Sequence, residues 1–109
     1  MDDKRERRLT ENEVRFRAVN ERVERERLGT GAGEEPIEFL CECTNEDCVE
    51  PLRMSLREYE QVRSDPRQFA VVPGHERGAI EEVVADEERF RVVRKTGEAA
   101  EVAETTDPR

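Results

Sequence analysis

Three cysteines and one histidine are the residues of this chain whose types and spacing could do chemistry. Cys41, Cys43 and Cys48 lie within eight residues, and the only histidine, His75, follows a Pro-Gly pair. Three thiolates and one imidazole make a complete tetrahedral shell for zinc. The pattern therefore predicts a zinc site formed by Cys41, Cys43, Cys48 and His75, with no open position for a catalytic water or a substrate.

Two other interpretations use the same residues. Cys41 and Cys43 can be buried strand cysteines, with Cys48 a loop thiol and His75 a residue that caps its turn. Alternatively, the thiols can form a redox pair or hold an iron–sulfur cluster. The polar Glu42 between two of the thiols argues against a wholly apolar buried strand, and this favours metal ligation.

The cellular compartment bears on how the cysteines are used. The 109-residue chain has no apolar run near the roughly 18 residues of a membrane helix, and its first 30 residues lack a hydrophobic secretory stretch. These features predict a soluble cytoplasmic protein. In that reducing compartment, an odd number of closely spaced cysteines indicates metal binding rather than disulfides.

The charge distribution limits the partners. The net charge is −9, of which residues 1–28 contribute +1 (nine basic, eight acidic) and the remainder −10 (ten basic, twenty acidic). A strongly acidic body repels phosphate backbones, so the charge disfavours nucleic-acid binding.

The sequence shows no second constellation that predicts catalysis. No nucleophile stands with an independent histidine base, because the single histidine is assigned to the metal. A run of acidic residues near the C-terminus is interpreted as the solvated face of a hairpin rather than as an acid–base or calcium site: Glu81, Glu82, Asp86, Glu87 and Glu88. We therefore expect no enzymatic activity.

The elements that must position these residues begin with an N-terminal helix. Thr10 followed by Glu13 is a capping-box pattern, which predicts a helix that starts at Thr10 and ends before Gly29. Phe16, Val19 and Val23 form one narrow apolar stripe on this helix. The stripe predicts that the helix docks on the rest of the chain, on a second copy, or on a protein partner.

The remaining elements follow from alternation and capping. Residues 37–43 alternate apolar with mostly polar side chains, which predicts a strand carrying Cys41 and Cys43 on one face. Ser55 and Glu58 form a second capping box that starts a short helix, and Pro66 ends it. Further strands are predicted at 52–54 and 69–72, with a hairpin over 80–85 and 90–95.

We therefore expect an α+β fold in which a small antiparallel sheet, one short helix and a zinc clasp follow an N-terminal helix. The predicted organisation is a charged helix at 1–28, a flexible linker at 29–36, a zinc-stabilised domain at 37–96 and a disordered acidic tail at 97–109.

Three segments resemble those of a group of small, uncharacterised bacterial proteins, mostly from high-GC Gram-positive organisms. They are ENEVRFRAVNERVE in the first helix, EFLCECTNEDC at the thiol cluster, and LREYEQVRSDPRQFAVVPGHE through the histidine. The likeness spans about Thr10 to Lys95. It implies that the three cysteines and His75 belong together as a metal site, and it implies no activity.

The function expected from the sequence is a small zinc-stabilised protein-binding or adaptor module, with a protein partner or self-association through the N-terminal helix. The alternative is a redox-sensing switch in which oxidation of the thiolates ejects zinc.

Overall fold

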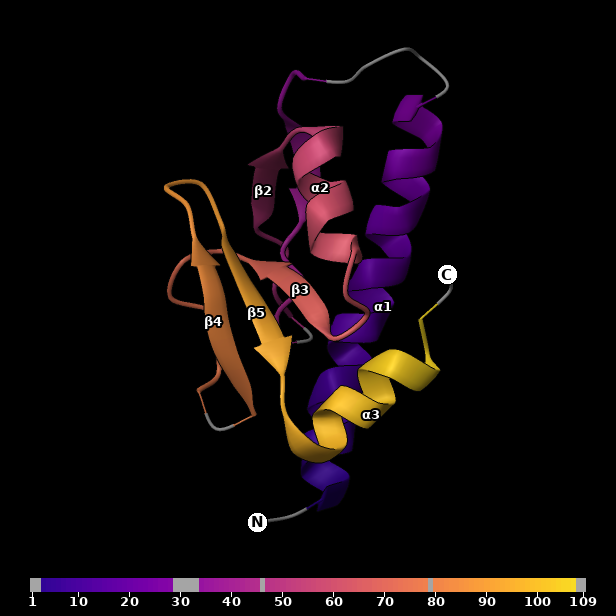
Figure 1. Ribbon diagram of the computed structural model, residues 1–109, viewed down its shortest axis with the longest axis vertical. Helices are drawn as coiled ribbons and strands as arrows, with labels where there is room; N and C mark the ends of the chain where they lie inside the picture. Colours follow the sequence, from indigo (N-terminus) through magenta and orange to yellow (C-terminus); the bar gives the residue numbers. More distant parts are fainter. Residues whose placement is uncertain (1–2, 29–33, 46, 79, 108–109) are drawn as a thin grey trace.

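The computed structural model describes residues 3–28, 34–45, 47–78 and 80–107, which form three helices and two small antiparallel sheets. In chain order the elements are α1 (Asp3–Leu28), β1 (Ile37–Leu40), β2 (Pro51–Met54), α2 (Leu56–Arg63), β3 (Gln68–Val71), β4 (Glu81–Asp86), β5 (Arg91–Lys95) and α3 (Gly97–Thr105). The predicted α+β class is confirmed. Figure 1 shows α1 along one side of the molecule and the β4–β5 hairpin on the opposite side.

The first sheet is the β1–β2 hairpin. Ile37 pairs with Met54 and Phe39 with Leu52, and all four side chains are buried because alternate residues of a strand share one face. β1 is shorter than the predicted strand and ends at Leu40, so Cys41 and Cys43 lie in the segment that follows it. The Cys41 amide still donates to the Glu50 carbonyl at 3.0 Å, which extends the hairpin toward the cysteines.

Helix α2 confirms the second capping box. The Ser55 hydroxyl accepts from the Glu58 amide at 3.1 Å, and the Glu58 carboxylate accepts from the Ser55 amide at 2.9 Å. These bonds satisfy backbone donors that a helix start leaves unpaired. The helix buries Leu56, Tyr59 and Val62, and the Tyr59 ring stacks on Phe39 with centroids 4.6 Å apart. In this way α2 packs on the first sheet.

The second sheet has the order β3-β5-β4, and its β4–β5 hairpin confirms the prediction. The central strand β5 pairs Val93 with both Phe69 of β3 and Val83 of β4. Phe69 and Val93 are fully buried, while Val83 is 44% exposed, so the core lies toward β3 and the outer edge of β4 faces solvent.

Helix α1 begins seven residues earlier than predicted, at Asp3, so Thr10 is not its first turn. Thr10 lies inside the helix and is fully buried, because α1 uses this position for packing rather than for capping. The buried side of α1 is also unlike the predicted apolar stripe, since Val19 is 47% exposed. Among the described side chains of α1, six polar ones are buried. Asn12 is one, and the other five follow alternating spacings of three and four: Thr10, Glu13, Arg17, Asn20 and Glu24.

The predicted disordered tail is wrong for the residues described. Gly97 to Thr105 form α3, which buries Ala99, Val102 and Ala103. α3 packs on α1, and Figure 1 shows the two helices crossing. Two features explain why this segment is helical and packs on α1. Gly97 adopts a φ of +58°, which turns the chain after β5. The alanine side chains of α3 are small, so the two helices can approach closely.

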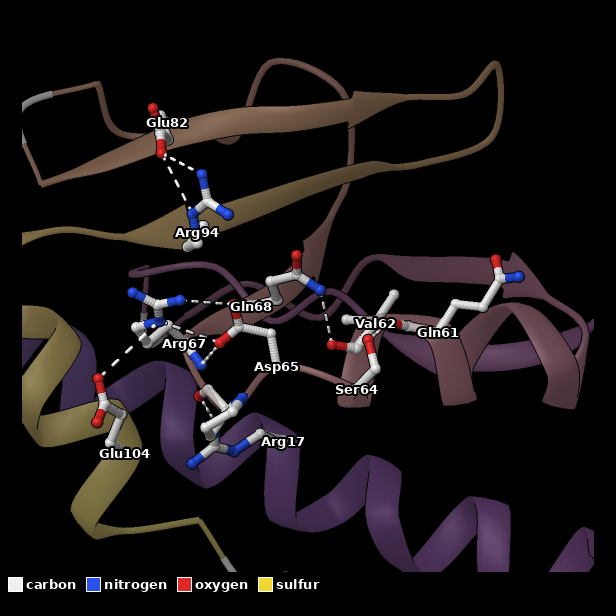
Figure 2. Close-up of polar contacts among 11 residues, drawn as sticks. Arg17, Gln61, Val62, Ser64, Asp65, Arg67, Gln68, Glu82, Arg94 and Glu104 are labelled. Carbon is white, nitrogen blue, oxygen red and sulfur yellow. Dashed lines mark hydrogen bonds and ion pairs between the residues drawn. The ribbon is translucent and has the colours of Figure 1, made fainter.

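Two buried arginines fasten these helices. Arg17 of α1 donates to the Pro66 carbonyl at 2.7 Å and to the Ala103 carbonyl of α3 at 3.0 Å, and its guanidinium lies 4.7 Å from the centre of the Phe69 ring. Figure 2 shows Arg17 reaching up from α1 toward the turn that precedes β3. Arg63 of α2 pairs with Glu21 of α1 and with Asp107 after α3. The helix predicted as a separate N-terminal unit is therefore packed on the body, and residues 29–33 of the predicted linker lie outside the described residues.

Candidate metal site

The structure brings all four predicted ligands together. The three cysteine sulfurs and one ring nitrogen of His75 lie within 4.8 Å of one another. The Cys41 and Cys48 sulfurs are 3.5 Å and 3.7 Å from His75 Nδ1. Metal–ligand bonds of about 2.0–2.3 Å at tetrahedral angles place neighbouring sulfur and nitrogen donors about 3.5 Å apart. The spacing therefore suits a four-coordinate metal ion.

Short backbone bonds hold the ligands in place. The Cys48 amide donates to the Asn45 carbonyl at 3.0 Å, which forms the turn that returns the third thiol. The His75 amide donates to the Val72 carbonyl at 2.9 Å, and Gly74 supplies the positive φ of +98° within that turn. The Val72 amide also donates to the Cys41 sulfur at 3.2 Å. The histidine turn and the first thiol are thus fixed to each other.

Glu50 orients the imidazole, a role that the sequence did not reveal. Its Oε2 lies 2.7 Å from His75 Nε2, on the side of the ring opposite Nδ1. A carboxylate in this position fixes the tautomer and the orientation of the ring, so that Nδ1 is the free ligand atom. The only signal in the sequence was that Glu50 lies two residues beyond Cys48, which is too common a spacing to indicate contact.

The thiols influence one another. A hydrogen bond from Cys41 lowers the pKa of Cys43 to about 5, and the same contact together with burial raises the pKa of Cys41. Burial raises the pKa of Cys48. The cluster on its own thus favours one thiolate beside protonated neighbours, whereas a bound cation stabilises all three thiolates.

Glu42 lies between two ligands and is fully buried. Its Oε2 accepts from the Tyr59 hydroxyl and from Asn20 Nδ2, both at 2.8 Å, and its Oε1 accepts from the Ala70 amide at 2.9 Å. Burial raises the pKa of Glu42, and the Ala70 bond opposes that effect. The sequence indicated only that position 42 was polar; its partners come from three distant segments.

A second polar cluster corrects the interpretation of the acidic hairpin. Glu82 and Asp86 are exposed and pair with Arg94 and Arg91, as expected of a solvated face. Glu81 instead is buried and, with Glu13 of α1, contacts the buried ammonium of Lys95. This cluster joins α1 to the second sheet.

No protein-family model, curated protein or solved structure matches this chain. The resemblance to a bacterial group stays a prediction, and the case for the site depends on its geometry.

Among the described helices, none combines the length and the apolar composition required to cross a membrane.

Proposed function

We propose that this protein is a small zinc-stabilised protein-binding module. The observation that carries the proposal is the convergence of three thiols and one imidazole within 4.8 Å. Soft thiolates with one imidazole favour zinc over the hard cations, which prefer oxygen ligands. Cys41, Cys43, Cys48 and His75 are the proposed zinc ligands.

A structural role for the zinc is supported by the ligand count. Four protein side chains fill a tetrahedral shell, and catalytic zinc sites typically keep one position for water. The metal would also join two parts of the fold, because the cysteines belong to the first hairpin and His75 lies in the turn after β3. We therefore propose no catalytic activity. Because the three cysteines are free thiols, which persist in a reducing compartment, we also propose a cytoplasmic location.

Removal of the metal tests this proposal directly. We expect the purified full-length chain to contain one zinc per molecule by elemental mass spectrometry, and its near-ultraviolet circular dichroism from buried Tyr59 to be lost with a strong chelator, because metal binding and folding are linked. Re-addition of zinc should restore the signal.

Two single variants are compared. Cys43→Ser removes a proposed ligand, and Ser64→Ala is its control, because the Ser64 side chain is exposed and lies away from the site. Only the first variant should lose zinc. A metal-free, fully ordered wild-type chain would disprove the proposal.

The binding surface proposed for this module is a groove beside α1. It has a volume of about 290 Å³, and its apolar lining comes from α1, from β1 and from the segment after Cys48: Val19, Val23, Leu40, Val49 and Pro51. Val49 is 81% exposed and Val19 is 47% exposed, so two apolar side chains that line the same groove are open to solvent. Sedimentation of the wild-type chain and of Val19→Asp over a range of concentrations would test self-association through this groove.

The thiol cluster also supports a second candidate, the zinc–thiolate redox switch. Hydrogen peroxide would take two electrons from two neighbouring thiolates, which would form a disulfide and release Zn²⁺ while the peroxide is reduced to water. Zinc release that proceeds faster than oxidation of a free thiol, measured with a zinc dye, would favour this function; inert thiols would exclude it.

A further inference from the structure

Helix α1 contacts the backbone on both sides of the Cys41-Glu42-Cys43 segment. On one side, the Asn20 amide group pairs with Leu40 as a neighbouring strand would: Oδ1 accepts from the Leu40 amide at 2.7 Å, and Nδ2 donates to the Leu40 carbonyl at 2.8 Å. On the other side, Asn12 Nδ2 donates to the Thr44 carbonyl at 3.3 Å. The two asparagines therefore bracket the segment that carries two of the ligands.

The spacing of the asparagines matches the segment they bind. The eight-residue step from Asn12 to Asn20 rises about 12 Å along an α-helix, and the four-residue step from Leu40 to Thr44 spans about 13 Å when extended. Asn12 and Asn20 also lie within the same half of the circumference of α1, because an eight-residue step ends about 80° beyond two full turns. A helix displaced by one turn would place both side chains away from their backbone partners.

Glu42 links this contact to the interior. Asn20 Nδ2 reaches Glu42 Oε2 at 2.8 Å, and the same carboxylate accepts from Tyr59 of α2 and from Ala70 of β3. The Glu42 amide donates to the Ala70 carbonyl at 2.8 Å, so both its backbone and its side chain are fixed. With Glu42 held inward, Cys41 and Cys43 on either side are left to face His75.

We propose that Asn20 and Asn12 are positioning residues of the metal site, and that docking of α1 and binding of the metal are consequently coupled. The inference depends on the zinc site proposed above and adds a regulatory consequence: metal binding tightens the docking of α1, and α1 docking raises metal affinity by the same factor. Asn20 carries the larger share, because it makes three of the bonds and Asn12 makes one.

The test compares zinc affinities of full-length variants by competition with a chromophoric chelator. Substitution of a residue that orients metal ligands typically costs roughly 10–100-fold in affinity. We expect a loss in this range for Asn20→Ala and a smaller loss for Asn12→Ala. Arg22→Ala, an exposed change two residues from Asn20 on the same helix, should leave affinity unchanged.

A second control separates positioning from loss of stability. Glu21→Gln replaces one of the two carboxylates that pair with Arg63 and so loosens α1, while the bonds of Asn20 to Leu40 and of Asn12 to Thr44 are kept. It should lower the denaturant midpoint but leave zinc affinity and the visible spectrum of the cobalt-substituted protein unchanged, whereas Asn20→Ala should alter both. Equal losses of affinity in Glu21→Gln and Asn20→Ala would overturn the positioning role.

Hydrogen exchange of the wild-type chain tests the coupling even if Asn20→Ala fails to fold. Chelation should raise exchange in the middle of α1, around Asn12 to Asn20, before it raises exchange in β5. Unchanged protection of α1 after metal loss would disprove the coupling while leaving the zinc site intact. A wild-type chain that binds no zinc or cobalt would instead disprove the proposed function itself.

Discussion

At the scale of single residues, the site shows how one carboxylate can matter without touching the metal. Glu50 is not a ligand, yet its contact with His75 Nε2 leaves Nδ1 as the atom that faces the sulfurs. The residue is 57% exposed at its side chain, so water competes for part of this hydrogen bond. Its contribution should therefore be measurable but smaller than that of a ligand.

We predict that Glu50→Gln weakens zinc binding by about tenfold, at the low end of the range for residues that orient ligands. The amide can still accept from Nε2–H, but a neutral acceptor forms a weaker hydrogen bond than a carboxylate and so holds the ring less firmly. Zinc competition would measure the change. Glu38→Gln is the control, because Glu38 is exposed and has the same charge. Equal affinities for the two variants would contradict the role of Glu50.

Residue types and local spacing explain why the ligands could be predicted. Structural zinc sites use thiolate and imidazole donors, and this chain has only three cysteines and one histidine. The fourth ligand was predicted by elimination and by its Pro-Gly turn. Glu42 and Glu50 could not be predicted, because a glutamate is common on any surface and only the folded chain shows which ones lie against the site.

At the scale of elements, the polar side of α1 governs how the helix packs. Glu13 and Lys95 are fully buried at their side chains, and Lys95 also contacts Glu81. One ammonium faces two carboxylates, and Glu13 Oε2 has no hydrogen-bond partner among the described residues. Buried ion pairs of this kind contribute little net stability, but breaking one leaves an uncompensated charge.

We predict that Lys95→Met destabilises the fold by about 3–5 kcal/mol, the usual cost of leaving buried charges unpaired. Urea denaturation would measure it. Arg94→Met on the same strand is the matched control, because its pair with Glu82, drawn in Figure 2, is exposed and should be worth less than about 1 kcal/mol. Similar losses of stability in the two variants would show that water reaches the charges around Lys95 and screens them.

The same cluster predicts a dependence on pH. Burial raises the pKa of Glu13 well above its ordinary value of 4.5, with Lys95 opposing the shift. A raised pKa in the folded state stabilises the protein fully below the unfolded value and loses that contribution as the pH rises through the folded value. Glu13→Gln mimics the protonated form.

Wild type should therefore become progressively less stable than Glu13→Gln as the pH rises above 4.5. Thermal melts of both proteins across this pH range would measure the difference in their stability. Titrating groups that the two proteins share cancel in this difference. Glu11→Gln is the control, because Glu11 lies two residues from Glu13 on the exposed side of α1 and the substitution removes the same charge. A difference that stays constant with pH would contradict the raised pKa.

The elements that sequence reasoning placed correctly are those with local signals. The Ser55–Glu58 capping box and the β4–β5 hairpin are set by residues a few positions apart. Docking of α1 on the rest of the chain was one of three predicted alternatives, but the side that docks escaped prediction, because apolar spacing was taken as the guide and this helix buries Arg17 and Asn20. α3 escaped because a short acidic segment becomes helical here only through its alanines against α1.

At the scale of the whole molecule, the proposed metal would reinforce a contact that Cys41 and Glu42 already make with Val72 and Ala70. The first hairpin supplies the thiols, the turn beyond β3 supplies the imidazole, and α1 spans both sheets from the side (Figure 1). With 43% charged residues, the chain has little apolar area to spare for such connections. A metal ion and a set of buried polar contacts would therefore contribute stability that larger proteins obtain from their hydrophobic cores.

The polar side of α1 has a consequence for how this molecule behaves when it opens. A helix that packs through apolar side chains exposes a hydrophobic surface when it separates from the body, and such surfaces promote aggregation. Here the surface laid bare would be mostly Glu13, Arg17, Asn20 and Glu24, which water solvates readily. We therefore expect separation of α1 to expose less apolar area, and to cause less aggregation, than separation of a helix with an apolar buried side.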